Sequence, residues 1–148
     1  MTIHNGLYKL STKANNNQLY LGLSRDPSPS NVNDGIQVVV GPESSTTIVE
    51  VRNVRGDRYE LHLWYHSGLG IGYNTVQSLL GSQVMATSNA LEWRIEQGTR
   101  SNRFKISVPE SDLYWTITSE GEDETRITLR PLGGMPAEEW YFELQRNH

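Results

Sequence analysis

Short segments in which apolar and polar residues alternate run along the whole chain, and they constrain its fold more than any other feature. They are separated by turn-forming stretches such as Asn33-Asp34-Gly35 and Gly133-Gly134. Alternation with a period of two is typical of strands that bury one face. The twelve expected strands are 7–10, 18–23, 36–40, 46–51, 58–65, 69–73, 83–87, 91–96, 103–108, 113–118, 126–129 and 139–144. No stretch between them has the pattern of an amphipathic helix, so the chain is predicted to be all-β.

Related segments recur at about one third of the chain length. Tyr8 in Leu-Tyr-Lys-Leu, Tyr59 in Arg-Tyr-Glu-Leu and Phe104 in Arg-Phe-Lys-Ile are separated by 51 and 45 residues. A second repeated feature has about the same spacing. Val49-Glu50-Val51 and the stretches around Trp93 and Trp140 each lie at the end of one third of the chain. The 148 residues are therefore predicted to form a single domain, 1–148, with four-strand repeats at about 1–54, 55–99 and 100–148.

Three repeats of four strands are the outline of a β-trefoil, in which a six-stranded barrel is capped by three hairpins. One four-strand unit cannot bury its apolar face alone, whereas three together close a barrel and remove exposed strand edges. A jelly roll or an immunoglobulin-like sandwich is the competing architecture, and the threefold phase favours the trefoil. Alternation assigns ten residues to the interior: Leu61, Leu63, Trp93, Ile95, Ile106, Val108, Ile127, Leu129, Trp140 and Phe142.

Composition excludes several classes of partner. Thirteen Lys and Arg against 17 Asp and Glu give a net charge of −4, whereas nucleic-acid-binding surfaces are usually basic. No apolar run approaches the roughly 20 residues of a membrane span, and the N-terminal residues lack the pattern of a signal peptide. The absence of cysteine agrees with a reducing compartment. We therefore expect a cytoplasmic monomer without nucleic-acid or membrane partners.

The chain offers little for catalysis. None of its four histidines accompanies a serine in a Gly-x-Ser-x-Gly elbow, so a hydrolytic triad is not expected. Glu60, His62 and His66 share one strand face, as the ligands of a metal site can, but a further ligand is missing. The favoured interpretation is an outward polar face that alternates with Tyr59, Leu61, Leu63 and Tyr65. We expect no enzymatic activity, no metal and no cofactor.

One long connection, residues 24–35, separates the second expected strand from the third. Connections of this length are usually functional or mobile. Pro27 and Pro29 fix their own φ angles and bias Asp26 and Ser28 toward extended conformations. An extended segment with a single arginine, Arg25, is the kind of segment that a trypsin-like protease accepts across its cleft. An ordinary Pro/Ser-rich surface loop is the alternative interpretation.

Three stretches give the chain a resemblance to a known family: Gly6-Leu7-Tyr8-Lys9-Leu10, Leu19 to Asp26, and Glu139-Trp140-Tyr141-Phe142-Glu143. It resembles the fungal β-trefoil serine protease inhibitors, the cospin-like proteins of mushrooms. The resemblance implies that the loop between the second and third strands enters the protease, with Arg25 in the primary specificity pocket and Ser24, Asp26 and Pro27 beside it. The guanidinium would then form charge-assisted bonds with the pocket carboxylate. Trypsin-like serine proteases are therefore the expected partners.

Other loops carry arginines that have to be weighed. Arg55, in the tight turn between the fourth and fifth strands, is the second-choice reactive residue because Kunitz-type inhibitors of the same fold use that connection. Arg130 ranks third, because Pro131 follows it and proline after the scissile bond resists trypsin. Inhibition of cysteine proteases in the manner of mycocypins would use glycines in the early loops, where this chain has Asn15-Asn16-Asn17.

Sugar binding is the rival function, because lectins share the trefoil fold. Lectin trefoils commonly carry a Gln-x-Trp signature near each fourth strand. Here no glutamine stands two places before Trp93 or Trp140, so both tryptophans are expected in the core. Binding to some other protein, as a scaffold or a toxin subunit, is a third class of function.

Overall fold

A computed structural model describes residues 3–14, 17–24, 36–66, 68–74, 79–100, 102–118, 125–133 and 138–145. Each of the twelve expected strands is present in these ranges, with ends that differ by a few residues, so the all-β prediction is confirmed. A short 3-10 helix, η2 (Glu43–Ser45), precedes β4. The strands are β1 (Gly6–Ala14), β2 (Asn17–Leu23), β3 (Ile36–Gly41), β4 (Val49–Arg55), β5 (Arg58–Leu63), β6 (Gly70–Tyr73), β7 (Val84–Thr87), β8 (Glu92–Gln97), β9 (Arg103–Ser107), β10 (Tyr114–Thr118), β11 (Thr125–Arg130) and β12 (Trp140–Leu144).

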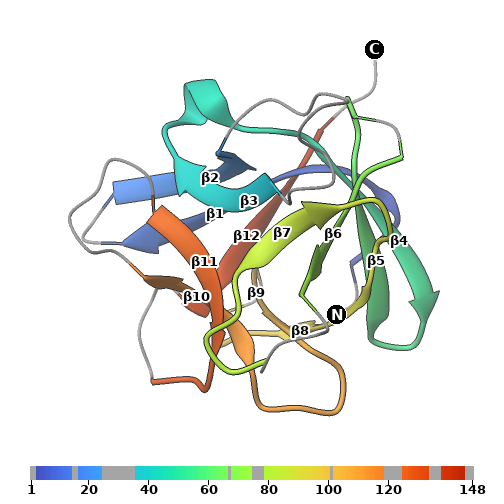
Figure 1. Cartoon of the computed structure of the whole chain (residues 1–148), viewed down its shortest axis with the longest axis vertical. Helices are drawn as coiled ribbons and strands as arrows, with labels where there is room; N and C mark the ends of the chain where they lie inside the picture. Colours follow the sequence, from blue (N-terminus) through green and yellow to red (C-terminus); the bar gives the residue numbers. More distant parts are fainter. Residues whose placement is uncertain are drawn as a thin grey trace.

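Half of the strands pair in a closed antiparallel ring. β1 pairs with β4, β5 with β8, and β9 with β12. The pairs β4–β5, β8–β9 and β12–β1 complete the ring. A closed ring has no free edge to which another chain can add a strand. Figure 1 shows the β4–β5 hairpin at one side of the molecule and β10–β11 at the opposite side.

The remaining strands form hairpins. They are β2–β3, β6–β7 and β10–β11. β3 also pairs with β7 and with β11, so the hairpins contact one another. The two ends of the long connection between β2 and β3 are thereby built into this part of the fold.

Ring and hairpins enclose one hydrophobic core. Of the ten residues predicted inside, all except Phe142 are buried, and Phe142 is half-buried and packs against the core. Its ring meets Tyr8 and Phe104 edge to face, with centroids 5.8 and 5.5 Å away. Trp93 and Trp140 are both fully buried, which confirms that they belong to the core.

β5 ends two residues earlier than predicted. The N–H of Leu63 donates to the carbonyl oxygen of Leu69 at 3.0 Å, and the N–H of Leu69 donates to that of His66 at 3.1 Å, so the chain turns after Leu63. Tyr65 therefore lies in the turn with 71% of its surface exposed. The interpretation that Tyr65 continues the buried row of Tyr59, Leu61 and Leu63 was wrong, because alternation persists in the sequence beyond the point where strand pairing stops.

Candidate functional site

The predicted reactive loop begins at Ser24, directly after β2. Ser24 is half-buried, and its backbone N–H donates to the carbonyl oxygen of Gln37 at 3.0 Å. Leu23 and Val38 are paired residues of β2 and β3. Arg25, Asp26 and Pro27 lie outside the described residues. What the structure gives is the base of the loop, where both of its ends belong to one antiparallel strand pair.

The loop base also packs against η2. Gly22 forms a bridge with Thr46, and the N–H of Thr47 donates to the carbonyl oxygen of Leu21 at 3.0 Å. A Cβ at Gly22 would collide with the carbonyl oxygen of Ser45. Only glycine permits this approach of two backbones, so the end of β2 is fixed against the segment before β4.

The β3 side of the loop base contacts β7. β3 pairs with β7 through Ile36 and Gln37, and the side-chain amide of Gln37 donates to Oε1 of Gln83 at 2.6 Å. The strands that flank the long connection are thus held by η2 on one side and β7 on the other.

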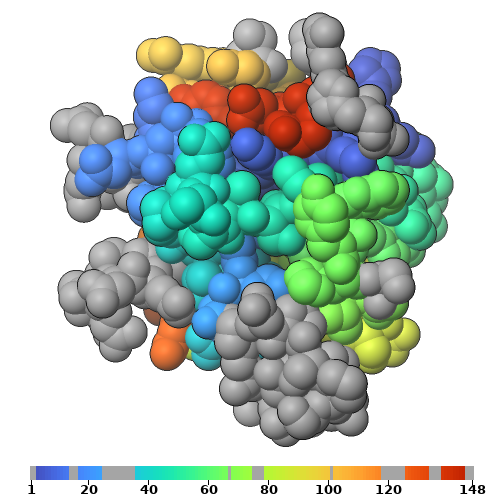
Figure 2. All heavy atoms as spheres, turned by 90° about the horizontal axis from the view of Figure 1, so that it is seen from above, coloured from blue at the N-terminus to red at the C-terminus, as the bar shows by residue number. Residues whose placement is uncertain are grey.

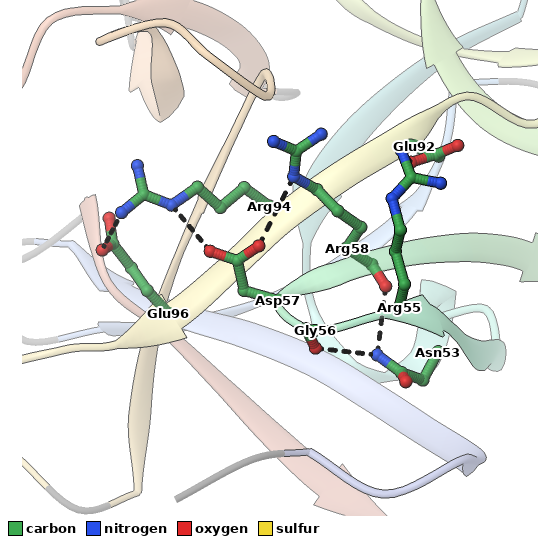
Figure 3. Close-up of polar contacts among 8 residues, drawn as sticks. All are labelled: Asn53, Arg55, Gly56, Asp57, Arg58, Glu92, Arg94 and Glu96. Atoms are coloured by element: carbon green, nitrogen blue, oxygen red, sulfur yellow. Dashed lines mark hydrogen bonds and ion pairs between the residues drawn. The ribbon is translucent and has the colours of Figure 1, made fainter.

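Arg55, the second-choice residue, lies at the turn between β4 and β5 (Figure 3). Its side chain is 67% exposed, and Nη2 lies 3.4 Å from Oε1 of Glu92. Gly56 has a φ of +50°, which suits a tight turn. The amide of Asn53 donates to the carbonyl oxygens of Gly56 and Arg58, both at 3.1 Å. The turn therefore presents an exposed cation on a short, internally bonded backbone.

Asp57 connects this turn to the neighbouring strand β8. Its carboxylate lies 3.4 Å from Nε of Arg58 and 3.1 Å from Nε of Arg94. Figure 3 draws both contacts as dashed lines. Arg94 also bonds Glu96 at 3.0 Å, and the phenol of Tyr114 donates to the other oxygen of Glu96 at 3.1 Å. Burial, followed by this hydrogen bond, raises the pKa of Tyr114 above its usual value. The network braces the turn that carries Arg55.

Two exposed aromatic residues escaped the sequence reasoning. Trp64 is 44% exposed and Tyr65 is 71% exposed, and both lie in the turn after β5. The sequence signal for their position is the turn-forming Ser67-Gly68 immediately downstream, which indicates that the strand ends before it.

The polar face of β5 holds a contact between Glu60 and His62, with Oε1 and Nε2 2.9 Å apart. Within the part of the chain that the structure describes, no group of three or more His, Asp or Glu side chains is placed to hold a metal ion. In the same ranges, no helix is long and apolar enough to cross a membrane.

No model of a known protein family matches the sequence, and no curated protein matches it. Solved structures do match over the full length. The Macrolepiota procera ricin B-like lectin, solved with lactose, has 18% identity and a TM-score of 0.73 and covers 98% of this chain and 100% of its own. A proteinase inhibitor from Coprinopsis cinerea has 19% identity and a TM-score of 0.71, with 97% and 100% covered.

The Rhizoctonia solani agglutinin aligns with a TM-score of 0.79 at 14% identity, covering 98% of this chain and 99% of that one. The matching proteins have β-trefoil folds. At these identities the likeness shows the fold, so the chain is an all-β protein of the β-trefoil type. The neighbours include both lectins and an inhibitor, and the fold alone does not distinguish these functions.

Proposed function

We propose that this protein inhibits trypsin-like serine proteases by entering the active-site cleft as a substrate does. In this proposal the connection between β2 and β3 is the reactive loop, Arg25 fills the primary specificity pocket, and Ser24, Asp26 and Pro27 lie along the cleft beside it. The resemblance to the mushroom inhibitors and the structural likeness to the Coprinopsis cinerea proteinase inhibitor support this class of function. We also infer that the closed ring and the hairpins make three four-strand repeats and that the protein acts as a cytosolic monomer.

The observation that carries the proposal is the anchoring of the loop base. Ser24 bonds Gln37 and Leu23 pairs with Val38, so the two ends of the loop start from adjacent strands. A loop whose ends are fixed loses less conformational entropy on docking than a free segment does, and this favours tight binding. Peptide-bond cleavage within such a loop leaves both new ends attached to paired strands, which favours religation over release.

Arg55 remains the second candidate. Its guanidinium is exposed, but it is paired with Glu92, and the backbone around Gly56 is closed by the hydrogen bonds of Asn53. A protease cleft requires several residues in extended conformation, which a turn this tight does not supply.

The test is a titration of trypsin with the parent protein, Arg25→Ala and Arg55→Ala, with chymotrypsin and papain as control enzymes. We expect stoichiometric inhibition of trypsin by the parent and by Arg55→Ala, and a loss of at least about thirtyfold in affinity for Arg25→Ala, since truncating a buried anchor costs about 2 kcal/mol or more. Loss only in Arg55→Ala would move the site to the β4–β5 turn. No inhibition by the parent protein would refute the proposal.

Carbohydrate binding is the alternative function, and the lectin neighbours favour it. Trp93 and Trp140 are fully buried and therefore offer no ring face to a sugar, so a lectin function would need other aromatic residues. A glycan array on the parent protein tests carbohydrate binding, and the trypsin titration tests inhibition separately.

A further inference from the structure

A row of residues crosses five neighbouring strands on the outside of the ring. Tyr20 of β2 is paired with Gly41 of β3 on one side and with Ser11 of β1 on the other. Ser11 is paired in turn with Tyr141 of β12, and Tyr141 with Arg103 of β9. The middle residue of the row is small, and each of its neighbours is a tyrosine. A depression between two aromatic rings is therefore expected above Ser11.

The structure has a pocket at this place, with a volume of about 330 Å³. It is lined by Ser11, Tyr20 and Tyr141 together with Gln18, Asn102, Phe142 and Glu143. Figure 2 shows β12 (red) at the surface of this face, between the N-terminal strands (blue) and the segment near residue 100 (gold). The volume is at the lower end of the range for small-molecule sites, about 300 Å³, and suits one sugar ring better than a larger ligand.

Contacts within the protein hold Ser11 and Tyr141, which line the pocket, in place. Ser11 is 1% exposed, and its Oγ accepts a hydrogen bond from the side-chain amide of Gln18 at 2.9 Å. The Arg103 guanidinium lies over the Tyr141 ring, 5.1 Å from its centroid. Because β9 and β1 pair with opposite edges of β12, Arg103 supports Tyr141 from the side away from Ser11.

The chemistry of the lining suits a neutral ligand with many hydroxyl groups. The amides of Gln18 and Asn102 can both donate and accept, the phenols do the same, and the carboxylate of Glu143 accepts. Among the described cations near the pocket, Arg103 stacks on Tyr141, Nζ of Lys9 lies 3.5 Å from Glu43, and Lys13 is exposed and paired with Gln18 in the β1–β2 register. The carboxylate of Glu143 repels an anionic ligand, which favours a neutral one.

We propose that this pocket binds a single neutral sugar ring. The hydroxyl groups of the sugar pair with Gln18, Asn102 and Glu143, and its apolar C–H face packs on a tyrosine ring. The phenol of Tyr20 is protonated at neutral pH and can both donate and accept hydrogen bonds. The site uses none of the residues of the proposed reactive loop, and its occupation is independent of protease inhibition.

Saturation-transfer NMR on the intact protein tests the proposal, with the methyl glycosides of glucose, galactose, mannose and N-acetylglucosamine as probes. We expect at least one of them to bind with a Kd on the order of 1 mM, which is reasonable for one ring in an open pocket. Tyr141→Ala and Glu143→Gln should each weaken that binding about tenfold or more. Tyr65→Ala is the matched control, because Tyr65 is an exposed tyrosine outside the pocket, and it should leave the Kd unchanged.

The pattern of outcomes is decisive. The Glu143→Gln change lies at an exposed position and leaves the packing intact, so it reports on the site even if Tyr141→Ala disturbs the fold. Absence of transfer from all four probes at about 50 mM would overturn the proposal, as would binding that keeps its affinity in both Glu143→Gln and Tyr141→Ala. Trypsin inhibition by Glu143→Gln, measured in parallel, separates a failure of this site from a failure of the proposed inhibitory function.

Discussion

The indole rings of Trp93 and Trp115 meet edge to face in the centre of the core, with 5.2 Å between centroids and 87° between planes. Both side chains are fully buried, but their polar groups differ. The Nε1–H of Trp93 donates to the carbonyl oxygen of Ile71 at 3.0 Å, whereas Nε1 of Trp115 has no hydrogen-bond partner. Two neighbouring tryptophans in the same core thus provide a matched pair in which one makes a buried hydrogen bond.

Replacing each of them by phenylalanine should separate the hydrogen bond from packing. Both substitutions remove a similar ring volume. Trp93→Phe also removes a buried hydrogen bond, whereas Trp115→Phe removes an N–H donor that had no partner. We expect Trp93→Phe to be the less stable variant by about 1 kcal/mol in urea unfolding. Equal free energies of unfolding, or the reverse order, would contradict this account.

Gly22 should not tolerate a side chain. A Cβ there meets the carbonyl oxygen of Ser45, which belongs to backbone and has little freedom to move. We expect Gly22→Ala to lower the free energy of unfolding by about 1–3 kcal/mol, as overpacking does. In the control Gly133→Ala, the new Cβ would lie 3.7 Å from Oε2 of Glu138, an ordinary contact, so its free energy of unfolding should stay within about 0.5 kcal/mol of the parent.

Asp57 holds two arginines that face each other across strands. Arg58 and Arg94 are paired residues of β5 and β8, and like charges in such positions repel. Because Asp57 is half exposed, Asp57→Asn should cost only about 0.5–1 kcal/mol in thermal unfolding at low ionic strength. The loss should shrink in 1 M NaCl, where the Debye length is about 3 Å. A cost that does not depend on salt would mean that the loss comes from the turn backbone instead.

Period-two alternation was sufficient to predict twelve strands and most of the core. Leu61, Leu63, Trp93 and Ile95 are buried because each stands on the inner face of a strand that is paired on both sides. Tyr65 has the same sequence pattern but lies past the last strand pairing, and local periodicity carries no information about where a partner strand ends.

The pocket above Ser11 was also beyond sequence reasoning. It depends on the register that places Ser11 between Tyr20 and Tyr141, which are far apart in the chain. Register of this kind is set by side chains of the whole ring together, not by any one strand. Arg25 stays a prediction, because it lies outside the described residues and rests on local sequence features, two prolines and a single cation, together with the resemblance to the mushroom inhibitors.

Trp64, in the turn after β5, should be the tryptophan that a quencher in solution reaches. It is 44% exposed, whereas Trp93, Trp115 and Trp140 are fully buried. We expect acrylamide to quench part of the tryptophan fluorescence in the parent protein and almost none of it in Trp64→Phe. The unfolding midpoint of Trp64→Phe should stay close to that of the parent. Strong quenching in the variant would mean that the core tryptophans are accessible in solution.

Ionisation of the Tyr114 phenol should make the folded protein less stable at alkaline pH. Burial and the hydrogen bond to Glu96 raise its pKa above the usual 10.0, so the folded state holds the phenolic proton more tightly than the unfolded chain does. The stabilisation is complete below pH 10 and is lost as the pH rises through the pKa of the folded state. Tyr114→Phe removes this titration, so its free energy of unfolding should fall less steeply than that of the parent between pH 9 and about 11. Tyr65→Phe, with its exposed ring, serves as the control and should follow the parent curve. If the slopes of Tyr114→Phe and the parent coincide, the hydrogen bond to Glu96 does not act on the alkaline transition.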